Sequence, residues 1–367
     1  TTPVENKNTP AQGYHLMTDL ADKAVKWIGQ QKVLAPDKPF FIYFAPGATH
    51  APHHVAPEWI EKYKGKFDQG WDKLREETFA RQKKLGVIPE DCLLTARPKE
   101  VPAWDAMPEA FKRVLCREME VYAGYLEYTD HEVGRVVETL EKLSILEDTL
   151  IYYIVGDNGA SAEGGINGAF NEMSYFNGLQ GFETAEYLTE RIDKLGGPES
   201  YNHYAVGWAH AMNTPYQWTK QVASHWGGTR NGTVVHWPKG IKAKGEIRSQ
   251  YAHAIDMVPT VLDCLGITPP TSIRGVTQSP IQGFSLKSSF DDAKAPAMHI
   301  TQYFEMFGHR SLYHDGWRAV CPWPGQSFVE SGLGFGAPIT YDKLTELDAK
   351  GWEIYDLTSD FAETNDL

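Results

Sequence analysis

The sequence predicts an α/β fold, in which helices cover a mostly parallel sheet and a smaller antiparallel sheet lies near the C-terminus. Two apolar runs of strand length, "PFFIYFAP" (39–46) and "TLIYYIVGDNG" (149–159), each follow an amphipathic helix. A helix that precedes a buried strand is half of the crossover connection between parallel strands. After residue 290 the pattern changes to short alternating segments separated by glycines, which is typical of antiparallel strands.

The helices are predicted from apolar residues at helical spacing. The first is "TDLADKAVKWIGQQ" (18–31), with Thr18 as its N-cap. A long helix covers 110–143, and its apolar stripe runs through several tyrosines. A third helix covers 254–266 and is expected to stop at Gly266. Two further stretches, "PEWIEKYKGKF" and "GWDKLREETFARQKKLG", are expected to form surface helices.

The remaining segments divide the chain into two expected parts. "TVVHWP" (233–238) is a short predicted strand, and the Gly-, Asn- and aromatic-rich stretch 160–219 is long for a connection, which indicates a functional segment. We expect an α/β core over 1–290 and an antiparallel subdomain over 291–367.

Composition excludes several classes of protein. The net charge of −13 argues against a general nucleic-acid binder, which needs a basic face. No stretch approaches the roughly 20 apolar residues of a membrane-spanning helix. The four cysteines lie far apart without a C-x-x-C pair, so we expect free thiols and neither a disulfide framework nor a zinc knuckle.

Asp157 and Asn158 stand where the second apolar strand ends. Ligands collect beyond the carboxyl ends of strands in α/β sheets, and neighbouring carboxylate and amide oxygens suit Ca²⁺ or Mg²⁺. The same "DNG" is also strong turn chemistry, and for this tripeptide alone the turn is the better interpretation. Two oxygens cannot fill a calcium shell of about 6–8 ligands, so other ligands would have to come from elsewhere.

His50 follows the first apolar strand, in "FAPGATHAPHHVAP". A histidine at this edge of a sheet can donate a proton to a leaving group or bind an anion. A solvated or capping role is the better interpretation for His53 and His54. The spacing of the three histidines also suggests a zinc site. However, the flanking prolines disfavour a helix that would carry two ligands, and no Cys or Glu is near in the sequence.

Lys220 and His225 precede a Gly–Gly pair in "WTKQVASHWGGTRNG" (218–232). Two glycines allow the backbone to approach a ligand closely, and an ammonium at about 4 Å from an anion attracts it by about 4 kcal/mol at an effective dielectric constant near 20. Lys220 would therefore suit a sulfate or phosphate oxygen. Taken alone, a surface lysine beside a structural glycine turn is the better interpretation of the pattern.

Together these motifs resemble the sulfatases, in which a histidine after one core strand, D-N-G after a later one and a lysine before G-G occur in this order. The stretches "KPFFIYFAPGATHAPHH", "IVGDNGASAEGG", "NHYAVGWAHAMNTPYQWTKQVASHWGGTRNG" and "AIDMVPTVLDCLG" are similar to bacterial-type arylsulfatases. The resemblance runs through the whole chain. It implies an alkaline-phosphatase-like core and hydrolysis of a sulfate ester to an alcohol or phenol and inorganic sulfate.

The resemblance also implies roles for the residues that match the motifs. Asp157 and Asn158 become ligands of one calcium ion, for which magnesium is an alternative. His50 becomes the group beside the leaving-group oxygen, and Lys220 the lysine that binds sulfate. Lys220 lies one residue farther from the glycine pair than in many sulfatases, so His225 is considered for a share of this role.

One part of the family pattern is missing. The sulfatase nucleophile is a formylglycine made within a C-x-P-x-R or S-x-P-x-R motif, and no cysteine or serine of this sequence stands in one. The family's N-terminal Asp pair and its lysine–histidine pair have no counterpart either. We therefore expect the formylglycine on a segment outside this sequence, either upstream in the same gene or on a separate, complementary N-terminal polypeptide of the same enzyme, and expect this chain alone to be inactive. The resemblance also implies that the core lacks its first strands and that the C-terminal subdomain is truncated.

Two other functions remain open. A phosphate or phosphonate monoester hydrolase of the same superfamily would use the same residues to bind an anion and a metal. A catalytically inactive binding or assembly fragment would explain the missing nucleophile. The expected partner in the enzymatic case is a sulfate-ester small molecule or glycan, with no nucleic acid and no membrane segment. The sequence does not name the compartment; a soluble protein of the bacterial periplasm or cytoplasm is expected.

Overall fold

The computed structural model describes residue 6, residues 8–323 and residues 340–367. Its α-helices are α1 Leu16–Leu34, α2 Pro57–Glu61, α3 Gly70–Leu85, α4 Glu109–Lys142, α5 Met173–Phe176, α6 Ala185–Thr189, α7 Val206–Met212, α8 Trp226–Thr229, α9 Met257–Leu265 and α10 Tyr341–Lys350. Its strands are β1 Ile151–Ile154, β2 Thr233–His236, β3 Ser272–Ile273, β4 Val276–Thr277, β5 Thr301–Met306, β6 His309–His314, β7 Trp317–Cys321 and β8 Glu353–Asp356. Short 3₁₀ turns lie at Pro10–Gln12, Trp104–Ala106, Leu146–Asp148, Gln180–Phe182, Ile192–Lys194, Ala254–Asp256 and Lys287–Ser289.

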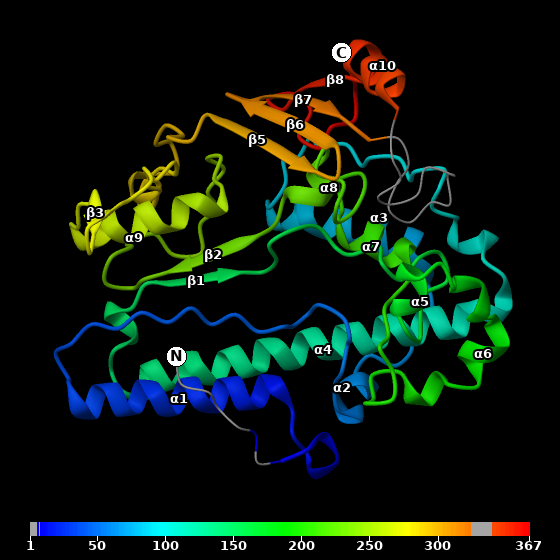
Figure 1. Ribbon diagram of the computed structural model, residues 1–367, viewed down its shortest axis with the longest axis horizontal. Coiled ribbons are helices and arrows are strands. Elements are labelled where there is room, and N and C mark those ends of the chain that lie inside the picture. The colour runs from blue at the N-terminus through cyan, green and yellow to red at the C-terminus, as the bar shows by residue number, and fades with distance from the viewer. Residues whose placement is uncertain (1–5, 7, 324–339) are drawn as a thin grey trace.

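Three helices, α1, α2 and α6, pack against the long helix α4. Figure 1 shows α1 and α4 running together along one side, with the strands on the other. The predicted N-cap of α1 is wrong: the helix begins at Leu16, and the His15 ring accepts a hydrogen bond from the backbone N–H of Met17. Thr18 lies inside the helix, where its hydroxyl contacts the Tyr128 hydroxyl of α4.

The main core lies where α3, α4 and α7 meet. Trp71, Trp104 and Trp208 pack together there, and the rings of Trp71 and Trp208 meet edge to face at 5.5 Å. The indole N–H of Trp208 donates to the carbonyl of Leu115 on α4, at 2.9 Å. A side chain at Gly207 would collide with the Trp71 ring at 2.3 Å, so α7 approaches α3 this closely only with glycine at that position. This core supports the loops on either side of α7.

The sheets are smaller than expected. In the described residues, strand pairs are antiparallel: β1 pairs with β2, β3 with β4, and β5–β6–β7–β8 form a four-stranded sheet in that order. The antiparallel C-terminal sheet is thus confirmed. The parallel pairing expected between 39–46 and the later strand is not formed in the part of the chain that is described.

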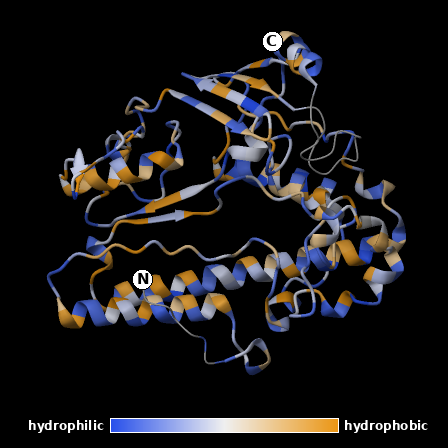
Figure 2. Ribbon diagram, viewed as in Figure 1, coloured by the Kyte–Doolittle hydropathy of each residue, from blue (hydrophilic) through white to orange (hydrophobic). Residues whose placement is uncertain are grey.

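Segment 39–46 is extended, but it is not part of a sheet. Its exposure alternates along the chain, as in a strand, and in the described structure the backbone of residues 40–45 makes no hydrogen bond to another backbone group. Phe41 and Tyr43 are 77% and 83% exposed. Figure 2 shows apolar residues along this segment and along β1 and β2. The prediction of a fully buried strand is therefore wrong for this segment: the apolar run is extended, but in the described structure no strand pairs with it and half of its side chains are exposed.

A buried ion pair fastens the C-terminal sheet to the rest of the chain. Arg318 of β7 and Glu363 are both fully buried and bonded to each other. The second oxygen of Glu363 accepts the backbone N–H of Trp226, at 2.8 Å, and the Arg318 guanidinium lies 3.7 Å from the Trp226 ring. Because Trp226 immediately precedes Gly227, this pair fixes the start of α8 and with it the glycine segment.

Other sequence-based expectations agree with the structure. Helix α9 ends at Gly266, which takes a left-handed conformation with φ 65°. All four cysteines are free. No helix within the described ranges has the length and apolar character needed to cross a membrane. The boundary near residue 290 stays a prediction.

Candidate functional site

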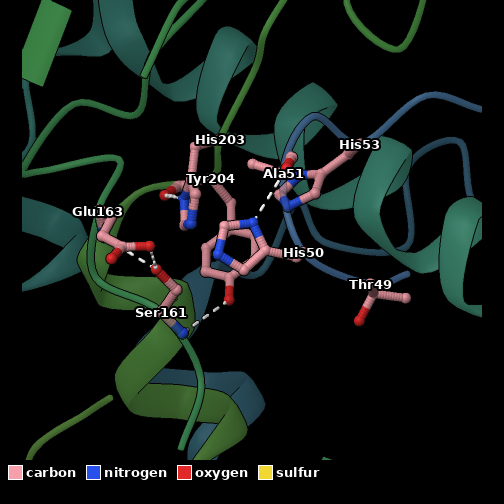
Figure 3. Close-up of a pocket in the computed structure, with 8 residues that line it drawn as sticks. All are labelled: Thr49, His50, Ala51, His53, Ser161, Glu163, His203 and Tyr204. Carbon is pink, nitrogen blue, oxygen red and sulfur yellow. Dashed lines mark hydrogen bonds between the residues drawn. The ribbon is translucent and has the colours of Figure 1, made fainter. Parts of the chain in front are cut away.

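The His50 ring stands at the mouth of a small pocket with about 170 Å³ of empty volume. Figure 3 shows the eight lining residues, which come from the loop after segment 39–46, from the loop after β1 and from the start of α7: Thr49, His50, Ala51, His53, Ser161, Glu163, His203 and Tyr204. The Nδ1 of His50 is bonded to the carbonyl of Ala51 at 2.9 Å, so Nδ1 is the donor. The other ring nitrogen, Nε2, is left to face Lys220.

Lys220 joins this pocket from the segment before α8. Its Nζ lies 3.2 Å from the Nε2 of His50 and 3.0 Å from the Oε2 of Glu163. Its backbone N–H donates to the carbonyl of Ala160, at 2.9 Å. The lysine side chain is 16% exposed and that of Glu163 8%, so water screens the ion pair only partly. Two residues that are 170 positions apart are thus in direct contact.

Glu163 is held on both of its oxygens. The Ser161 hydroxyl donates to Oε2 at 2.7 Å, and the Gln221 amide donates to Oε1 at 2.8 Å. Burial by itself would raise the pKa of this carboxyl, but the hydrogen bond from Ser161 and the charge of Lys220 outweigh it and hold the pKa below its ordinary value. Glu163 is therefore a carboxylate at neutral pH.

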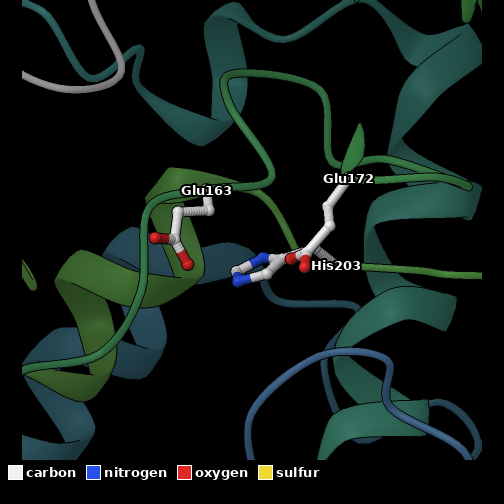
Figure 4. Close-up of side chains that lie close together, drawn as sticks. All are labelled: Glu163, Glu172 and His203. Carbon is white, nitrogen blue, oxygen red and sulfur yellow. The ribbon is translucent and has the colours of Figure 1, made fainter. Parts of the chain in front are cut away.

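Glu172, which does not line the pocket, and His203, which does, lie close to Glu163 (Figure 4). Both are buried, and Oε2 of Glu172 has no hydrogen-bond partner among the described residues. Burial and the nearby Glu163 raise the pKa of Glu172 to about 7, and burial lowers the pKa of His203 to about 4. The imidazole of His203 is therefore neutral near pH 7, and Glu172 changes charge there.

The three side chains could be considered as a metal site, since one ligand atom from each lies within 4.8 Å of the others. A zinc ion needs ligand atoms at about 2.0–2.2 Å, so these groups would have to move inward. Glu163 already accepts hydrogen bonds from Ser161 and Gln221 and pairs with the ammonium of Lys220. In this arrangement it is the lysine cation that neutralises Glu163.

Asp157 and Asn158 lie on the loop that reaches this site from β1. Asp157 is exposed and Asn158 is half-buried. The next residue, Gly159, donates its N–H to the carbonyl of Gly228 at 3.0 Å, and a Cβ on it would lie 1.7 Å from the carbonyl oxygen of Gly227. The strand-end loop therefore packs directly on the glycine pair. Carboxylate and amide oxygens suit a hard cation, but two residues do not complete its shell, and their metal role stays a prediction.

His225 is not in this pocket. Its Nδ1 is bonded to the Ser224 hydroxyl at 3.0 Å, and its Nε2 lies 3.2 Å from Glu353 of β8. The ring is buried against the C-terminal sheet. The expectation that His225 shares the role of Lys220 therefore has no support from this geometry, and we assign it to holding the sheet.

The sequence-based reasoning missed Glu163, Glu172 and His203. Glu163 follows the "DNG" motif closely, but a glutamate in a Gly-rich segment is usually solvated, and its burial depends on Lys220 and Gln221, which are more than 50 residues away. Glu172 and His203 stand in the stretch 160–219 that was singled out as functional without any named residue. A local pattern could not have paired them.

Comparison with known proteins agrees with the geometry. The family model described as sulfatase matches residues 1–267. An uncharacterized sulfatase of Schizosaccharomyces pombe is 28% identical over 348 residues, which cover 94% of this chain and 57% of that protein. An arylsulfatase of Klebsiella aerogenes is 27% identical over 282 residues, covering 77% of this chain and 56% of that protein. The chain thus spans somewhat more than half the length of these two relatives.

The fold has solved counterparts. The crystal structure of Ps i-CgsB in complex with k-i-k-neocarrahexaose is similar to this chain with a TM-score of 0.53 and 17% identity, over 99% of this chain and 52% of that one. This likeness shows the α/β fold of the sulfatases, which has helices around the strands and a small antiparallel C-terminal sheet. On the match to the family model over most of its length, the chain belongs to the sulfatase family.

Proposed function

We propose that this chain supplies the sulfate-binding and leaving-group side of an arylsulfatase-like enzyme, which hydrolyses sulfate esters to an alcohol or phenol and inorganic sulfate. The observation that carries the proposal is the contact between Lys220 and His50 at the mouth of the pocket, at 3.2 Å. It brings an ammonium, which can stabilise charge on sulfate oxygens, beside an imidazole that can transfer a proton.

Within this mechanism each side chain has a stated task. Lys220 binds an oxygen of the sulfate group, and the ion pair with Glu163 holds its ammonium in place. His50 is fixed by the bond between Nδ1 and Ala51, so Nε2 is the atom that faces the departing oxygen. Because Nδ1 carries the hydrogen of the neutral ring, Nε2 delivers a proton only from the doubly protonated imidazolium, which returns to the neutral ring as the alcohol leaves.

Two further groups complete the proposal. Asp157 and Asn158 would hold one calcium ion, which supplies charge stabilisation at the sulfate oxygens when bound. A formylglycine is the family's nucleophile, and since the sequence has no matching motif we propose that it comes from a complementary polypeptide.

The proposal is tested in the complete enzyme with 4-nitrophenyl sulfate. Lys220→Met should lower kcat/KM by about 10²–10³-fold, the range for loss of one group that stabilises developing charge. Lys239→Met is the matched control, because Lys239 pairs with Asp148 on the surface and should change kcat/KM less than about twofold. If both variants keep full activity, Lys220 does not bind the sulfate. Faster turnover of phosphate than of sulfate esters by the wild type would favour the phosphatase alternative instead.

The role of His50 has its own test. His50→Ala should slow esters with poor leaving groups, such as alkyl sulfates, much more than 4-nitrophenyl sulfate, because nitrophenolate leaves without a proton. Equal losses for both esters would argue against an acid role.

The metal assignment is tested by calcium titration. Asp157→Ala should abolish stoichiometric calcium binding, whereas Asp148→Ala, on an exposed surface pair, should leave it unchanged. Calcium binding that survives in Asp157→Ala contradicts the ligand role.

We also propose that segment 39–46 and β1 receive a strand of the complementary polypeptide. The segment has strand-like alternation and unpaired backbone groups, β1 pairs with β2 alone, and Ile154 and Val155 at the end of β1 are exposed. Unpaired apolar edges of this kind bind added strands. The proposed occupant is the polypeptide that corresponds to the part of the relatives beyond the match.

This interaction is tested by co-purification and native mass spectrometry. Tyr43→Glu should weaken the complex, because Tyr43 would be buried under the added strand. Tyr341→Glu on α10 is matched in residue type and in exposure, 81% against 83%, and should leave the complex intact. A chain that remains monomeric and inactive when both polypeptides are present would favour the inactive-fragment alternative.

A further inference from the structure

The cation of the proposed sulfate site is already paired with a buried carboxylate. Lys220 contacts two residues of the lining, His50 at 3.2 Å and Glu163 at 3.0 Å, and within the described part of the chain no other lysine or arginine is bonded to the lining. The two other histidines of the lining, His53 and His203, are neutral near pH 7 because burial lowers the pKa of each. The positive potential that this chain offers an anion is therefore that of a lysine partly cancelled by Glu163.

A partly cancelled charge affects singly and doubly charged anions differently. The attraction of an anion to the site grows in proportion to its charge, whereas the cost of removing it from water grows with the square of its charge. A weak positive potential can thus repay the desolvation of a monoanion and fail to repay that of a dianion. Sulfate monoesters carry one negative charge near neutrality, and phosphate monoesters carry two above their second pKa of about 6.

We propose that Glu163 is a specificity-determining residue, whose carboxylate lowers the potential at Lys220 so that the pocket selects monoanionic sulfate esters over dianionic phosphate esters. This inference rests on the proposed function, because it assumes that Lys220 is the sulfate ligand. It goes beyond that function by assigning the discrimination between two classes of ester to Glu163, a residue to which the resemblance gave no role.

The geometry supports an electrostatic role beyond simple packing. Gln221 donates to Oε1 of Glu163, and Ser161 donates to Oε2, the oxygen that also contacts Lys220, so the charge of Glu163 stays in place when an anion binds. A glutamine at this position keeps the shape and can still accept from Lys220 and donate or accept within the same pocket. Glu163→Gln therefore removes the charge with little change in structure.

The inference makes a quantitative prediction. A change in electrostatic potential alters the binding free energy of a dianion by twice as much as that of a monoanion. The logarithm of the change in affinity should therefore be twice as large for the dianion. Because the Lys220–Glu163 pair is partly buried, we expect Glu163→Gln to lower the Kd of methyl sulfate by about threefold and that of methyl phosphate by about tenfold. Charges elsewhere in the complete site act equally on wild type and variant, so the comparison isolates Glu163.

The experiment measures the Kd values of methyl sulfate and methyl phosphate at pH 8 by isothermal titration calorimetry, on the complete enzyme. The measurements are made in a Glu172→Gln background, because Glu172, with a pKa of about 7, is largely ionised at pH 8 and would add a second negative charge beside Glu163. Glu346→Gln is the matched control, because Glu346 also lies 3.0 Å from a lysine, Lys343, but on the exposed face of α10. It should change neither Kd.

The outcomes separate this inference from the proposed function. A larger gain for methyl phosphate than for methyl sulfate supports the inference, even if the enzyme does not turn over sulfate esters. Equal gains for both anions overturn it. A loss of affinity for both anions also overturns it, because Glu163 would then only position Lys220. Failure of the background variant itself to bind methyl sulfate overturns it as well.

Discussion

Replacing Arg318 by methionine should destabilise the protein by about 3–5 kcal/mol, the cost of leaving a buried carboxylate without its partner. Arg318 and Glu363 are fully buried, and Arg318 also donates to the Ser311 hydroxyl at 2.9 Å. Methionine keeps much of the volume but supplies no donor. Since whole domains are stable by only about 5–15 kcal/mol, this loss is a large fraction of the total.

The assay is urea denaturation followed by tryptophan fluorescence, in which a change of midpoint at constant slope reports a change in stability. Arg310→Met is the control on the neighbouring strand, because Arg310 forms a pair with Asp348 at 2.7 Å that is largely exposed and should be worth less than about 1 kcal/mol. In the double variant Arg318→Met/Glu363→Gln the charge that lost its partner is gone, so much of the stability should return. An Arg318→Met variant that is as stable as the control would refute the reasoning, and so would a double variant whose loss equals the sum of the single losses.

Three other measurements follow from buried groups. Folding raises the pKa of Glu172 to about 7, so the folded protein retains a proton that the unfolded chain loses near pH 4.5. Stability, measured by thermal melting, should therefore fall as pH rises from about 5 to 8. Glu172→Gln should flatten this profile, and an unchanged slope would contradict the assignment. Gly159→Ala should lower the melting temperature by several degrees, since its Cβ would overlap a backbone carbonyl, whereas Gly232→Ala, with nothing within 4 Å, should not; equal melting temperatures would show that the loop has room. Cys264, which is half-buried, should react with a thiol reagent at pH 8 before Cys116, whose pKa burial raises to about 12; the reverse order would contradict the packing.

The sequence was sufficient where structure depends on local pattern. The apolar stripe placed the long helix at 110–143, and α4 covers Glu109–Lys142. Gly266 ends α9 as expected, because glycine adopts the left-handed backbone conformation at little energetic cost and other residues do not. Thr18 was the wrong cap because the apolar pattern does not show which polar residue just before a helix has its side chain turned toward the free N–H groups.

The partners of extended segments and buried charges could not be predicted in this way. The run at 39–46 identifies an extended apolar segment, but pairing depends on what lies beside it in space. His50 and Lys220 were placed in one site through the resemblance, and the structure brings them into contact. The burial of Glu163 arises from residues that are distant in sequence, and a glutamate that is solvated and one that is buried look the same in a sequence.

Two backbone hydrogen bonds tie the strand-end loop to the segment that carries Lys220: Gly159 to Gly228, and Lys220 to Ala160. The Asn213 side chain adds a third link, because it accepts the backbone N–H of Ala160 and donates to the carbonyl of Trp218. If Asp157 and Asn158 bind a cation and Lys220 an anion, as proposed, these links connect the two positions, and any effect of one ion on the affinity for the other must be reciprocal.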